Sequence, residues 1–398
     1  MQSTCIIGGG PAGMMLGFLL ARAGLPVTVL EKHKDFFRDF RGDTIHPSTL
    51  ELLNELGLYE KFLDVPHSQV TCLSAIVGGR KFAMSDFSHL PTRAKFIALM
   101  PQWDFLNFLA AEAKQYPTFT LRMGWEATEL VERDGVVTGV RAETPDGPQE
   151  ITRDLIVGCD GRHAMTKDAA ALKVIEEGVP IDVLWFRIAR QDSDPENALG
   201  YANFGRLVIL INRRDYFQVG FLIAKDHYEE IQQRGLSQFH QELERIVPFL
   251  SGRTGEIGSW EQIKLLTVQV NHLQRWSRPG LLCIGDAAHA MSPVGGIGIN
   301  IALQDAVAAA NMLTARLLAG SVRHQDLESV QHYREGAVRN TQRVQIVAHK
   351  ILDRVLRDPG PLTPPWQLQL ATRIPGFQRL TARFIGLGLQ PQHIQAST

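Results

Sequence analysis

The stretch that decides the fold is CIIGGGPAGMMLGFLLARAGLPVTVLE, which runs from Cys5 to Glu31. Thr4 to Ile7, at its start, is a short apolar run with β-branched residues and predicts a strand. Three glycines with the spacing G-x-G-x-x-G come next, and Met14 to Ala23 is rich in helix formers. Val27 to Leu30 then predicts a second strand. The order is therefore strand, tight turn, helix and strand.

The glycines of this stretch suit a turn that holds a phosphate. Gly8 permits the tight turn, Gly10 lets the backbone approach a pyrophosphate, and Gly13 lets the helix pack closely on the strand. The helix N-terminus adds unpaired N–H groups and positive partial charge. Glu31, 18 residues after Gly13 and at the end of the second strand, is placed to bind ribose hydroxyls. The stretch predicts a dinucleotide site without deciding between NAD and FAD, and a βα turn that binds nothing is the alternative.

Two further turns of this kind occur far along the chain. Leu155 to Val157 predicts a strand, and Cys159 to Gly161 follows at the end where open α/β sheets bind ligands. The other is GLLCIGDAAHAMSPVGGIGINIALQDAVAAANML, from Gly280 to Leu313, with a predicted strand, a Gly-Asp pair, a glycine-rich loop and a helix from Gly298. An aspartate after a strand can accept a sugar hydroxyl, and a loop of glycines can pass close to a flat ring system because glycine has no Cβ.

Together these motifs resemble the FAD-dependent aromatic hydroxylases of the p-hydroxybenzoate hydroxylase type, the group A flavoprotein monooxygenases. The resemblance covers Met1 to Asp358 in motif order and spacing, and GDAAHAMSPVGGIGINIALQDA is its most specific part. It implies an α/β fold with a Rossmann-type FAD-binding domain of the glutathione-reductase-like variant, an inserted, mainly β substrate domain, and C-terminal helices. FAD is the implied cofactor, and NADPH or NADH is the implied electron donor.

The resemblance also implies contacts with the cofactor. The first glycines and acid would bind the ADP part of FAD, and the Gly-Asp motif would contact the ribityl chain and pyrophosphate. Arg41 is expected at a pyrophosphate or at NAD(P)H, and Gln102, at a helix start, is expected at FAD. Pro293 and Gly295 to Asn300 would lie along the isoalloxazine edge. The expected FAD contacts are Gly8, Gly10, Ala12, Gly13, Glu31, Lys32, Arg41, Gln102, Asp160, Gly285, Asp286, Pro293, Gly296, Gly298, Ile299 and Asn300.

One segment departs from the family pattern. The Asp-Gly pair usually continues with a serine and then an arginine three residues later, whereas Ala164 and Lys167 stand in those places here. In the family that segment is linked to both FAD and NAD(P)H binding. The binding mode of the nicotinamide donor is therefore left open.

The chain is expected to fold as two interleaved domains and a tail. The expected pieces are 1–70, 98–178 and 272–357 for the FAD-binding domain, 71–97 and 179–271 for the substrate-binding β-sheet domain, and 358–398 for a C-terminal amphipathic tail. The strand-like runs of the insertions are Thr71 to Val77, Arg80 to Met84, Val183 to Ala189, Arg206 to Ile211 and Tyr216 to Ala224. They predict a sheet layer over the flavin that shapes the substrate pocket. Asp134-Gly135 predicts a hairpin within the cofactor domain.

The tail carries a basic amphipathic pattern. In RIPGFQRLTARFIGLGL, which ends at Leu389, the apolar Phe377, Leu380, Phe384 and Leu387 fall near one helical face and the arginines lie elsewhere. Such a helix either lies on a membrane surface or packs on its own domain or on a partner subunit. A peripheral membrane contact and a homodimer are both left open.

Composition excludes several classes of protein. The 41 basic and 42 acidic side chains leave a formal charge of −1, which gives no electrostatic footprint for nucleic acid. The four cysteines lack the spacing of a zinc site or a disulfide framework, so no metal is expected. No uncharged apolar run approaches the ~18 residues of a membrane span. Because Met1 to Thr4 also lack the positive charge of a secretory signal, a cytoplasmic location is expected.

The implied reaction is hydroxylation of an aromatic or quinone-like small molecule, with NAD(P)H and O2, through a C4a-hydroperoxyflavin. Two alternatives stay open: an FAD-dependent reductase or dehydrogenase of an isoprenoid or quinone, and a non-catalytic binding protein with the same fold. No catalytic residue is assigned. His46 is singled out for a test as the base that deprotonates a phenol, against a structural or solvent-facing role.

Overall fold

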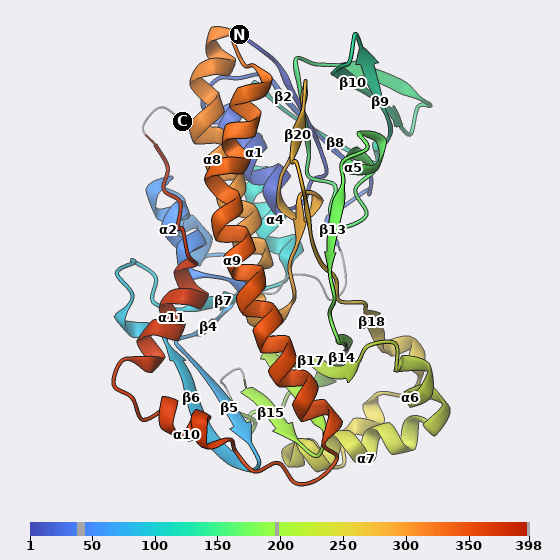
Figure 1. Ribbon diagram of the computed structural model, residues 1–398, viewed down its shortest axis with the longest axis vertical. Helices are drawn as coiled ribbons and strands as arrows, with labels where there is room; N and C mark the ends of the chain where they lie inside the picture. The colour runs from blue at the N-terminus through green and yellow to red at the C-terminus, as the bar shows by residue number, and fades with distance from the viewer. Residues whose placement is uncertain (38–43, 196–198, 396–398) are drawn as a thin grey trace.

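The computed structural model describes residues 1–37, 44–195 and 199–395 of the chain. Two large sheets form its upper and lower halves in Figure 1, and helix α9 (His324–Arg357) runs past both of them. The upper half contains the glycine-rich stretch at the start of the chain. The architecture is the α/β fold expected from the sequence, with a Rossmann-type sheet, a second, mainly β part and helices at the C-terminus.

The upper sheet has six strands in the order β20-β21-β12-β1-β2-β8, and only β20 and β21 are antiparallel neighbours. The strands are β1 (Thr4–Ile7), β2 (Val27–Glu31), β8 (Phe119–Met123), β12 (Leu155–Gly158), β20 (Ser277–Arg278) and β21 (Leu281–Cys283). Ile7 pairs with Gly158, and Gly158 pairs with Cys283. The strands predicted ahead of the three turns are confirmed, and their carboxyl ends meet at one edge of the sheet.

Helix α1 (Pro11–Arg22) is enclosed on nearly every side, with ten of its twelve residues buried. It packs between the upper sheet, α4 (Gln102–Ala113) and α8 (Gly298–Ala319). A helix that is apolar all round has to be covered in this way. Gly17 allows the close contact, since a Cβ there would lie 2.8 Å from Cγ2 of Val29.

The hairpin predicted at Asp134-Gly135 is confirmed. It joins β9 (Glu126–Arg133) to β10 (Val136–Glu143), and β11 (Gln149–Thr152) completes a three-stranded sheet beside the upper half. Asp134 and Gly135 have φ of 50° and 76°, the left-handed values that a type I′ turn requires at both positions.

The lower sheet has seven strands in the order β18-β14-β17-β16-β15-β5-β6. The strands are β5 (Cys72–Val77), β6 (Arg80–Asp86), β14 (Ile181–Ala189), β15 (Leu199–Asn203), β16 (Arg206–Asn212), β17 (Tyr216–Ala224) and β18 (Lys264–Leu266). The five strand runs predicted from alternation correspond to β5, β6, β14, β16 and β17, and they are confirmed. The strand β15 and the short edge strand β18 were not among the predicted runs.

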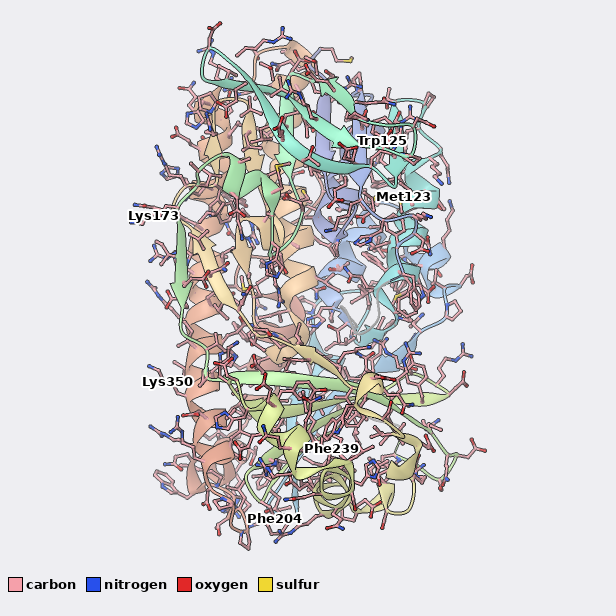
Figure 2. The ribbon with its side chains drawn as sticks, turned by 90° about the vertical axis from the view of Figure 1, so that its right-hand side faces the viewer. Met123, Trp125, Lys173, Phe204, Phe239 and Lys350 are labelled. Carbon is pink, nitrogen blue, oxygen red and sulfur yellow. The ribbon has the colours of Figure 1, made fainter. Side chains whose placement is uncertain are left out.

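The two faces of the lower sheet have different neighbours. On one face Phe186 packs against Phe239 of α7 (Leu236–Ile246), with ring centroids 5.5 Å apart, inside a closed apolar core. Figure 2 shows Phe239 beneath the sheet and the cofactor half above it. The other face carries Trp185 in a cluster with Val294, which belongs to the loop before α8. The second face is therefore turned toward the upper half of the molecule.

Smaller elements complete the fold. Two small sheets consist of β3 (Thr44–Ile45), β4 (Ser68–Val70) and β7 (Ile97–Leu99), and of β13 (Val174–Glu177), β19 (Val270–Leu273) and β22 (His289–Ala290). The remaining short helices before the tail are α2 (Pro47–Glu55), α3 (Tyr59–Leu63), α5 (Met165–Ala169) and α6 (Tyr228–Arg234). Within the described ranges, no helix combines the length and the apolar character needed to cross a membrane.

The C-terminal segment folds back along the molecule as α10 (Trp366–Ala371) and α11 (Phe377–Leu387). Helix α11 packs on β6 and α2, and its buried face centres on Ala382 and Gly386, where an added Cβ would lie 2.8 Å from Cδ1 of Leu90. Leu380 of the predicted apolar face is 69% exposed and does not pack on the rest of the described chain. Small residues let the helix approach its neighbours closely, and a search for large apolar side chains misses such a face.

Candidate active site

The first glycine turn lies directly against the turn that follows β12. Gly8 has φ of 103°, a value that suits glycine, and a Cβ on it would lie 2.3 Å from the carbonyl oxygen of Cys159. Gly13 is equally confined, since its Cβ would lie 2.0 Å from the carbonyl oxygen of Gly8. Both glycines are needed for packing between strand, turn and helix.

The third turn closes this group. Gly285 has φ of 61° and lies between α1 and α8: an added Cβ would be 3.1 Å from Cβ of Ala12 and 3.2 Å from Cβ of Ala302. The contribution of Ala12 to the site is thus its small size, which allows the close approach of the third turn. Three segments far apart in sequence are thus packed against one another at the edge of the upper sheet.

Gly10 differs from the other two glycines because the space beside it is open. Its φ of −72° is ordinary, and no heavy atom of the described residues lies within 4 Å of where a Cβ would stand. None of the described side chains forms a capping hydrogen bond at the start of α1. The N–H groups of the first helical turn are therefore available to an anion, and the residues present fit the pyrophosphate of FAD.

Glu31 ends β2 beside the first glycine turn. Its carboxylate accepts hydrogen bonds from the backbone N–H groups of Gly9, at 3.0 Å, and His33, at 3.1 Å. The side chain of Lys32 is placed differently, because it is 56% exposed and its Nζ lies 3.9 Å from Glu126. The structure thus brings the acid to the turn and leaves the neighbouring lysine side chain at the surface.

Asp160 is engaged within the protein. Its carboxylate accepts hydrogen bonds from the backbone N–H of Thr166, at 2.9 Å, and from Oγ1 of the same residue, at 2.7 Å. Burial raises the pKa of Asp160, although these hydrogen bonds act in the opposite direction. Lys167, which stands where the family has arginine, is buried and donates from Nζ to the carbonyl oxygen of Arg162. Both side chains stabilise the turn in which they lie.

Asp286 faces a cation that the sequence analysis did not single out. Nε of Arg162 lies 3.1 Å from Oδ2 of Asp286, and Nη2 of the same guanidinium donates to the carbonyl oxygen of Met291 at 3.2 Å. Arg162 therefore connects the turn after β12 with the turn after β21 and adds positive charge at the site. In the sequence, the signal that could have identified Arg162 was its position directly after the Asp-Gly pair.

The loop before α8 is held from two sides. Gly296 has φ of 63°, and its carbonyl oxygen accepts from Oγ1 of Thr44 at 2.8 Å. The Asn300 side chain accepts from the backbone N–H of His46, at 2.9 Å, and from Oγ1 of Thr49, at 2.7 Å. The amide of Asn300 is thus used to connect α8 to the start of α2, and Gly298 opens the first turn of α8 without a side-chain cap among the described residues.

Helix α9 holds the same loop from behind. Nε2 of Gln345 donates to the carbonyl oxygens of Ser292 and Val294, both at 3.0 Å, and Oε1 accepts from the backbone N–H of Ser292 at 3.1 Å. Pro293 lies between these two residues. The clamp fixes the backbone that is expected along the isoalloxazine.

The remaining expected contacts have less defined surroundings. Gln102 is the first residue of α4 and half-buried, and none of the described residues forms a hydrogen bond with its side chain. Ile299 is half-buried in the first turn of α8. Arg41 lies outside the described residues.

His46 is fully buried at the start of α2. Its Nδ1 lies 2.7 Å from the carbonyl oxygen of Ile385 in α11, and its Nε2 is buried with no partner among the described residues. Desolvation lowers the pKa of His46 to about 4, although the hydrogen bond to Ile385 acts in the opposite direction. This geometry favours a structural role, in which the neutral ring connects α2 to the tail.

The buried ring predicts a pH-dependent stability. Because the pKa of His46 is about 4 in the folded chain and about 6.5 when unfolded, only the unfolded chain binds a proton here between these values. The contribution of His46 to the free energy of unfolding therefore has its full value above pH 6.5 and falls as the pH drops toward 4. Between pH 7 and pH 5 the free energy of unfolding should decrease by about 2 kcal/mol because of this group. Urea unfolding at the two pH values measures it. In His46→Gln the loss should be smaller by this amount, and an unchanged loss would contradict the assignment.

Three glycine turns at the carboxyl ends of neighbouring parallel strands, with an open helix N-terminus and an acid at the end of β2, define a Rossmann-type dinucleotide-binding protein. The chain belongs to the family described as FAD binding domain, which matches residues 1–344. FAD is its cofactor, as expected from the sequence.

Comparison with known proteins identifies the type of enzyme. The chain is 29% identical to 6-methylpretetramide 4-monooxygenase from Streptomyces rimosus over 96% of its own length and 91% of the relative. It is 26% identical to p-hydroxybenzoate hydroxylase from Acinetobacter baylyi, over 76% and 74% of the two chains. The fold is that of p-nitrophenol 4-monooxygenase from Pseudomonas putida, with a TM-score of 0.79, 18% identity and coverage of 98% and 99%. The chain is an FAD-dependent aromatic monooxygenase, and the resemblance noted in the sequence is confirmed.

Proposed function

We propose that this monooxygenase hydroxylates a planar aromatic molecule of several fused rings, with O2 and with NADPH or NADH as electron donor. The relative that aligns with nearly the whole chain is named for 6-methylpretetramide. The second face of the lower sheet supports the same class of substrate, because apolar side chains of its strands face the loop before α8.

The observation that carries the proposal is a row across the lower sheet in which glycines alternate with Trp185 and Ile209. Trp185 pairs with Gly220, Gly220 with Ile209, and Ile209 with Gly200, so all four share one face. The indole lies over Gly220, where an added Cβ would be 3.0 Å from its ring, and the space above Gly200 is open up to the Cβ of Ala75 at 4.0 Å. Ile209 is only half-buried although its strand is interior. An apolar floor beside an indole suits a flat ring system.

The cofactor would meet this floor at the loop before α8, since Trp185, Ile209 and Val294 belong to one apolar cluster. FAD supplies the chemistry of oxygen activation and transfer when it is bound. The chain itself would bind the pyrophosphate at Gly10 and the ribityl chain at Asp286, orient the ring system and keep water away from it. We also propose that the other residues named in the sequence analysis contact FAD, and that the two domains have the boundaries given there.

Reduction of the flavin by NADPH and by NADH under anaerobic conditions tests the function. We expect 1,8-dihydroxyanthraquinone, with three fused rings, to accelerate reduction at least ~tenfold more than the single-ring p-hydroxybenzoate, because substrate binding would orient the reacting groups. Equally fast reduction without either compound would favour a reductase. No reduction at all would favour the binding-protein alternative.

Filling the proposed floor should separate substrate binding from FAD binding. A valine at position 200 would occupy the open space above the strand, so Gly200→Val is expected to raise KM for the multi-ring compound at least ~tenfold by steric overlap. The FAD dissociation constant should stay at the wild-type value, because the cofactor turns lie in the upper half. Unchanged KM would place the substrate elsewhere.

The tail offers a second binding surface. Trp366, Leu370, Ile374 and Leu380 are all more than half exposed, and residues 359–395 contain three arginines and no acidic side chain. We propose that in a cytoplasmic enzyme this segment contacts an anionic membrane peripherally. Co-sedimentation with phosphatidylglycerol vesicles should be lost with phosphatidylcholine vesicles and with Leu380→Ser. A concentration-dependent dimer that buries this segment would instead favour the homodimer.

A further inference from the structure

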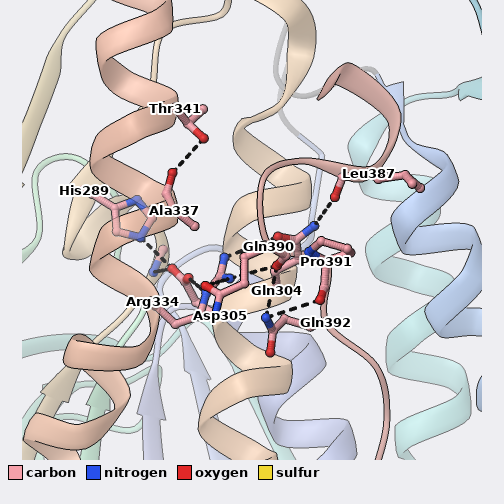
Figure 3. A network of polar contacts seen from close by, with 11 residues as sticks. His289, Gln304, Asp305, Arg334, Ala337, Thr341, Leu387, Gln390, Pro391 and Gln392 are labelled. Carbon is pink, nitrogen blue, oxygen red and sulfur yellow. Dashed lines mark hydrogen bonds and ion pairs between the residues drawn. The ribbon is translucent and has the colours of Figure 1, made fainter. Parts of the chain in front are cut away.

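A buried acid on α8 holds the backbone of the third turn. Asp305 is fully buried, and its Oδ2 accepts from the backbone N–H of Gly285 at 3.2 Å and lies 2.5 Å from Nε2 of His289 (Figure 3). Its Oδ1 accepts from Nε of Arg334 on α9 at 2.9 Å. The conformation of the turn that carries Asp286 thus depends on a carboxylate that solvent does not reach.

Arg334 extends this contact to the end of the chain. The residue is 1% exposed, and its Nη1 donates to the carbonyl oxygen of Gln390 at 3.1 Å and to its Oε1 at 3.3 Å. Nη2 donates to Oε1 of Gln304 at 3.3 Å, and Nε2 of Gln304 donates to the carbonyl oxygen of Leu387 at 3.1 Å. Figure 3 shows the guanidinium between the acid on one side and the tail on the other.

The charges make this arrangement interdependent. Burial acts to raise the pKa of Asp305, but His289 and Arg334 together hold it below its usual value. A guanidinium out of water needs acceptors for all its N–H groups, and the backbone of the tail provides part of them. If the tail leaves, Arg334 is drawn toward solvent and its hold on Asp305 weakens.

We propose that the C-terminal segment Leu387–Gln392 is a positioning element of the FAD site, acting through Arg334 and Asp305 on the Gly285 turn. This rests on the proposed role of that turn in holding FAD. The family match ends at residue 344, before this segment begins. Because coupling between two equilibria is reciprocal, docking of the tail strengthens FAD binding and FAD binding strengthens docking of the tail.

The first experiment uses the protein without any substitution. Hydrogen exchange of backbone amides in 387–395 is measured with and without saturating FAD. We expect exchange in this segment to slow at least ~threefold when FAD binds, with little change in the exposed residues of α10. Equal exchange in both states would overturn the proposal.

The second experiment is a double-mutant cycle read out by the FAD dissociation constant. Gly388 has φ of 80° and ψ of −173°, a conformation that essentially only glycine adopts, so Gly388→Ala displaces the tail without touching Arg334. Arg334→Lys keeps a cation for Asp305 but cannot reach both Gln304 and Gln390. Each single change is expected to weaken FAD binding about tenfold, and the pair together no more than either alone.

Controls separate this proposal from the one on which it rests. Leu380→Ser changes the exposed side of α11 and should leave the FAD dissociation constant unchanged. The coupling would be overturned if the fold-increases in the FAD dissociation constant caused by Gly388→Ala and Arg334→Lys multiply in the double variant. It would also be overturned if Gly388→Ala leaves this constant unchanged. If Asp286→Asn does not weaken FAD binding either, the proposed FAD site itself is wrong, whereas a loss with Asp286→Asn alone refutes only the role of the tail.

Discussion

The Gly10→Ala protein is expected to fold normally and to be isolated without its yellow colour. Alanine tolerates the backbone conformation at position 10, and apart from its chain neighbours no atom of the described residues lies within 4 Å of the added Cβ. It would occupy the space in which we place the pyrophosphate, and the overlap should weaken FAD binding by about 2 to 3 kcal/mol, or roughly a hundredfold. Fluorescence titration of the apoprotein with FAD measures the dissociation constant, and thermal unfolding measures the fold.

Substitutions at two other glycines serve as controls for this result. Gly178 also has open space around its Cβ position but lies outside the turns, so Gly178→Ala should bind FAD as the wild type does. Gly13→Ala should lower the thermal stability of the apoprotein itself, because its Cβ would lie 2.0 Å from a backbone oxygen. A Gly10→Ala protein that keeps its flavin would show that the pyrophosphate does not pass the start of α1.

Asp286→Asn is expected to weaken FAD binding by roughly 10- to 100-fold, because it removes a charged acceptor for a ribityl hydroxyl and the partner of Arg162. The same titration measures the effect. Glu132 provides a matched control: it pairs with Arg278 at 2.7 Å, and the exposures of that pair, 35% and 26%, resemble the 34% and 24% of Asp286 and Arg162. Glu132→Gln should leave FAD binding unchanged. An equal loss of FAD affinity in both variants would show that Asp286 has no specific role in FAD binding.

Local patterns were sufficient to predict the strands ahead of the three turns and the hairpin after β9, but not β8 or β20 of the upper sheet. The strand at Thr4–Ile7 and the turn at Asp134-Gly135 depend on neighbouring residues, and both have the predicted bounds. The gathering of the three turns at one sheet edge depends on the parallel order β21-β12-β1, which local patterns do not give. Helices α6 and α7 were not predicted, since the alternation used to find strands in 179–271 does not detect them.

The polar partners within the site could not be predicted. Asn300 bonds to the backbone of His46, 254 positions away, and Arg162 bonds to Asp286, 124 positions away. Which partner a side chain selects depends on the packed fold, and no local pattern encodes it. The place of Asp160 just after a strand was predicted, but its hydrogen bonds to Thr166 depend on the folded turn.

Helix α9 contacts both halves of the enzyme and fixes their separation. Its 34 residues span about 50 Å, and the same helix clamps the loop at Ser292 and packs on strands of the lower sheet. The separation between the Ser292 loop and the lower sheet therefore depends on this helix, which rises about 1.5 Å and turns about 100° per residue. A single inserted residue would rotate one end of α9 by about 100° relative to the other, so a change in the separation of the two halves calls for insertions close to whole helical turns.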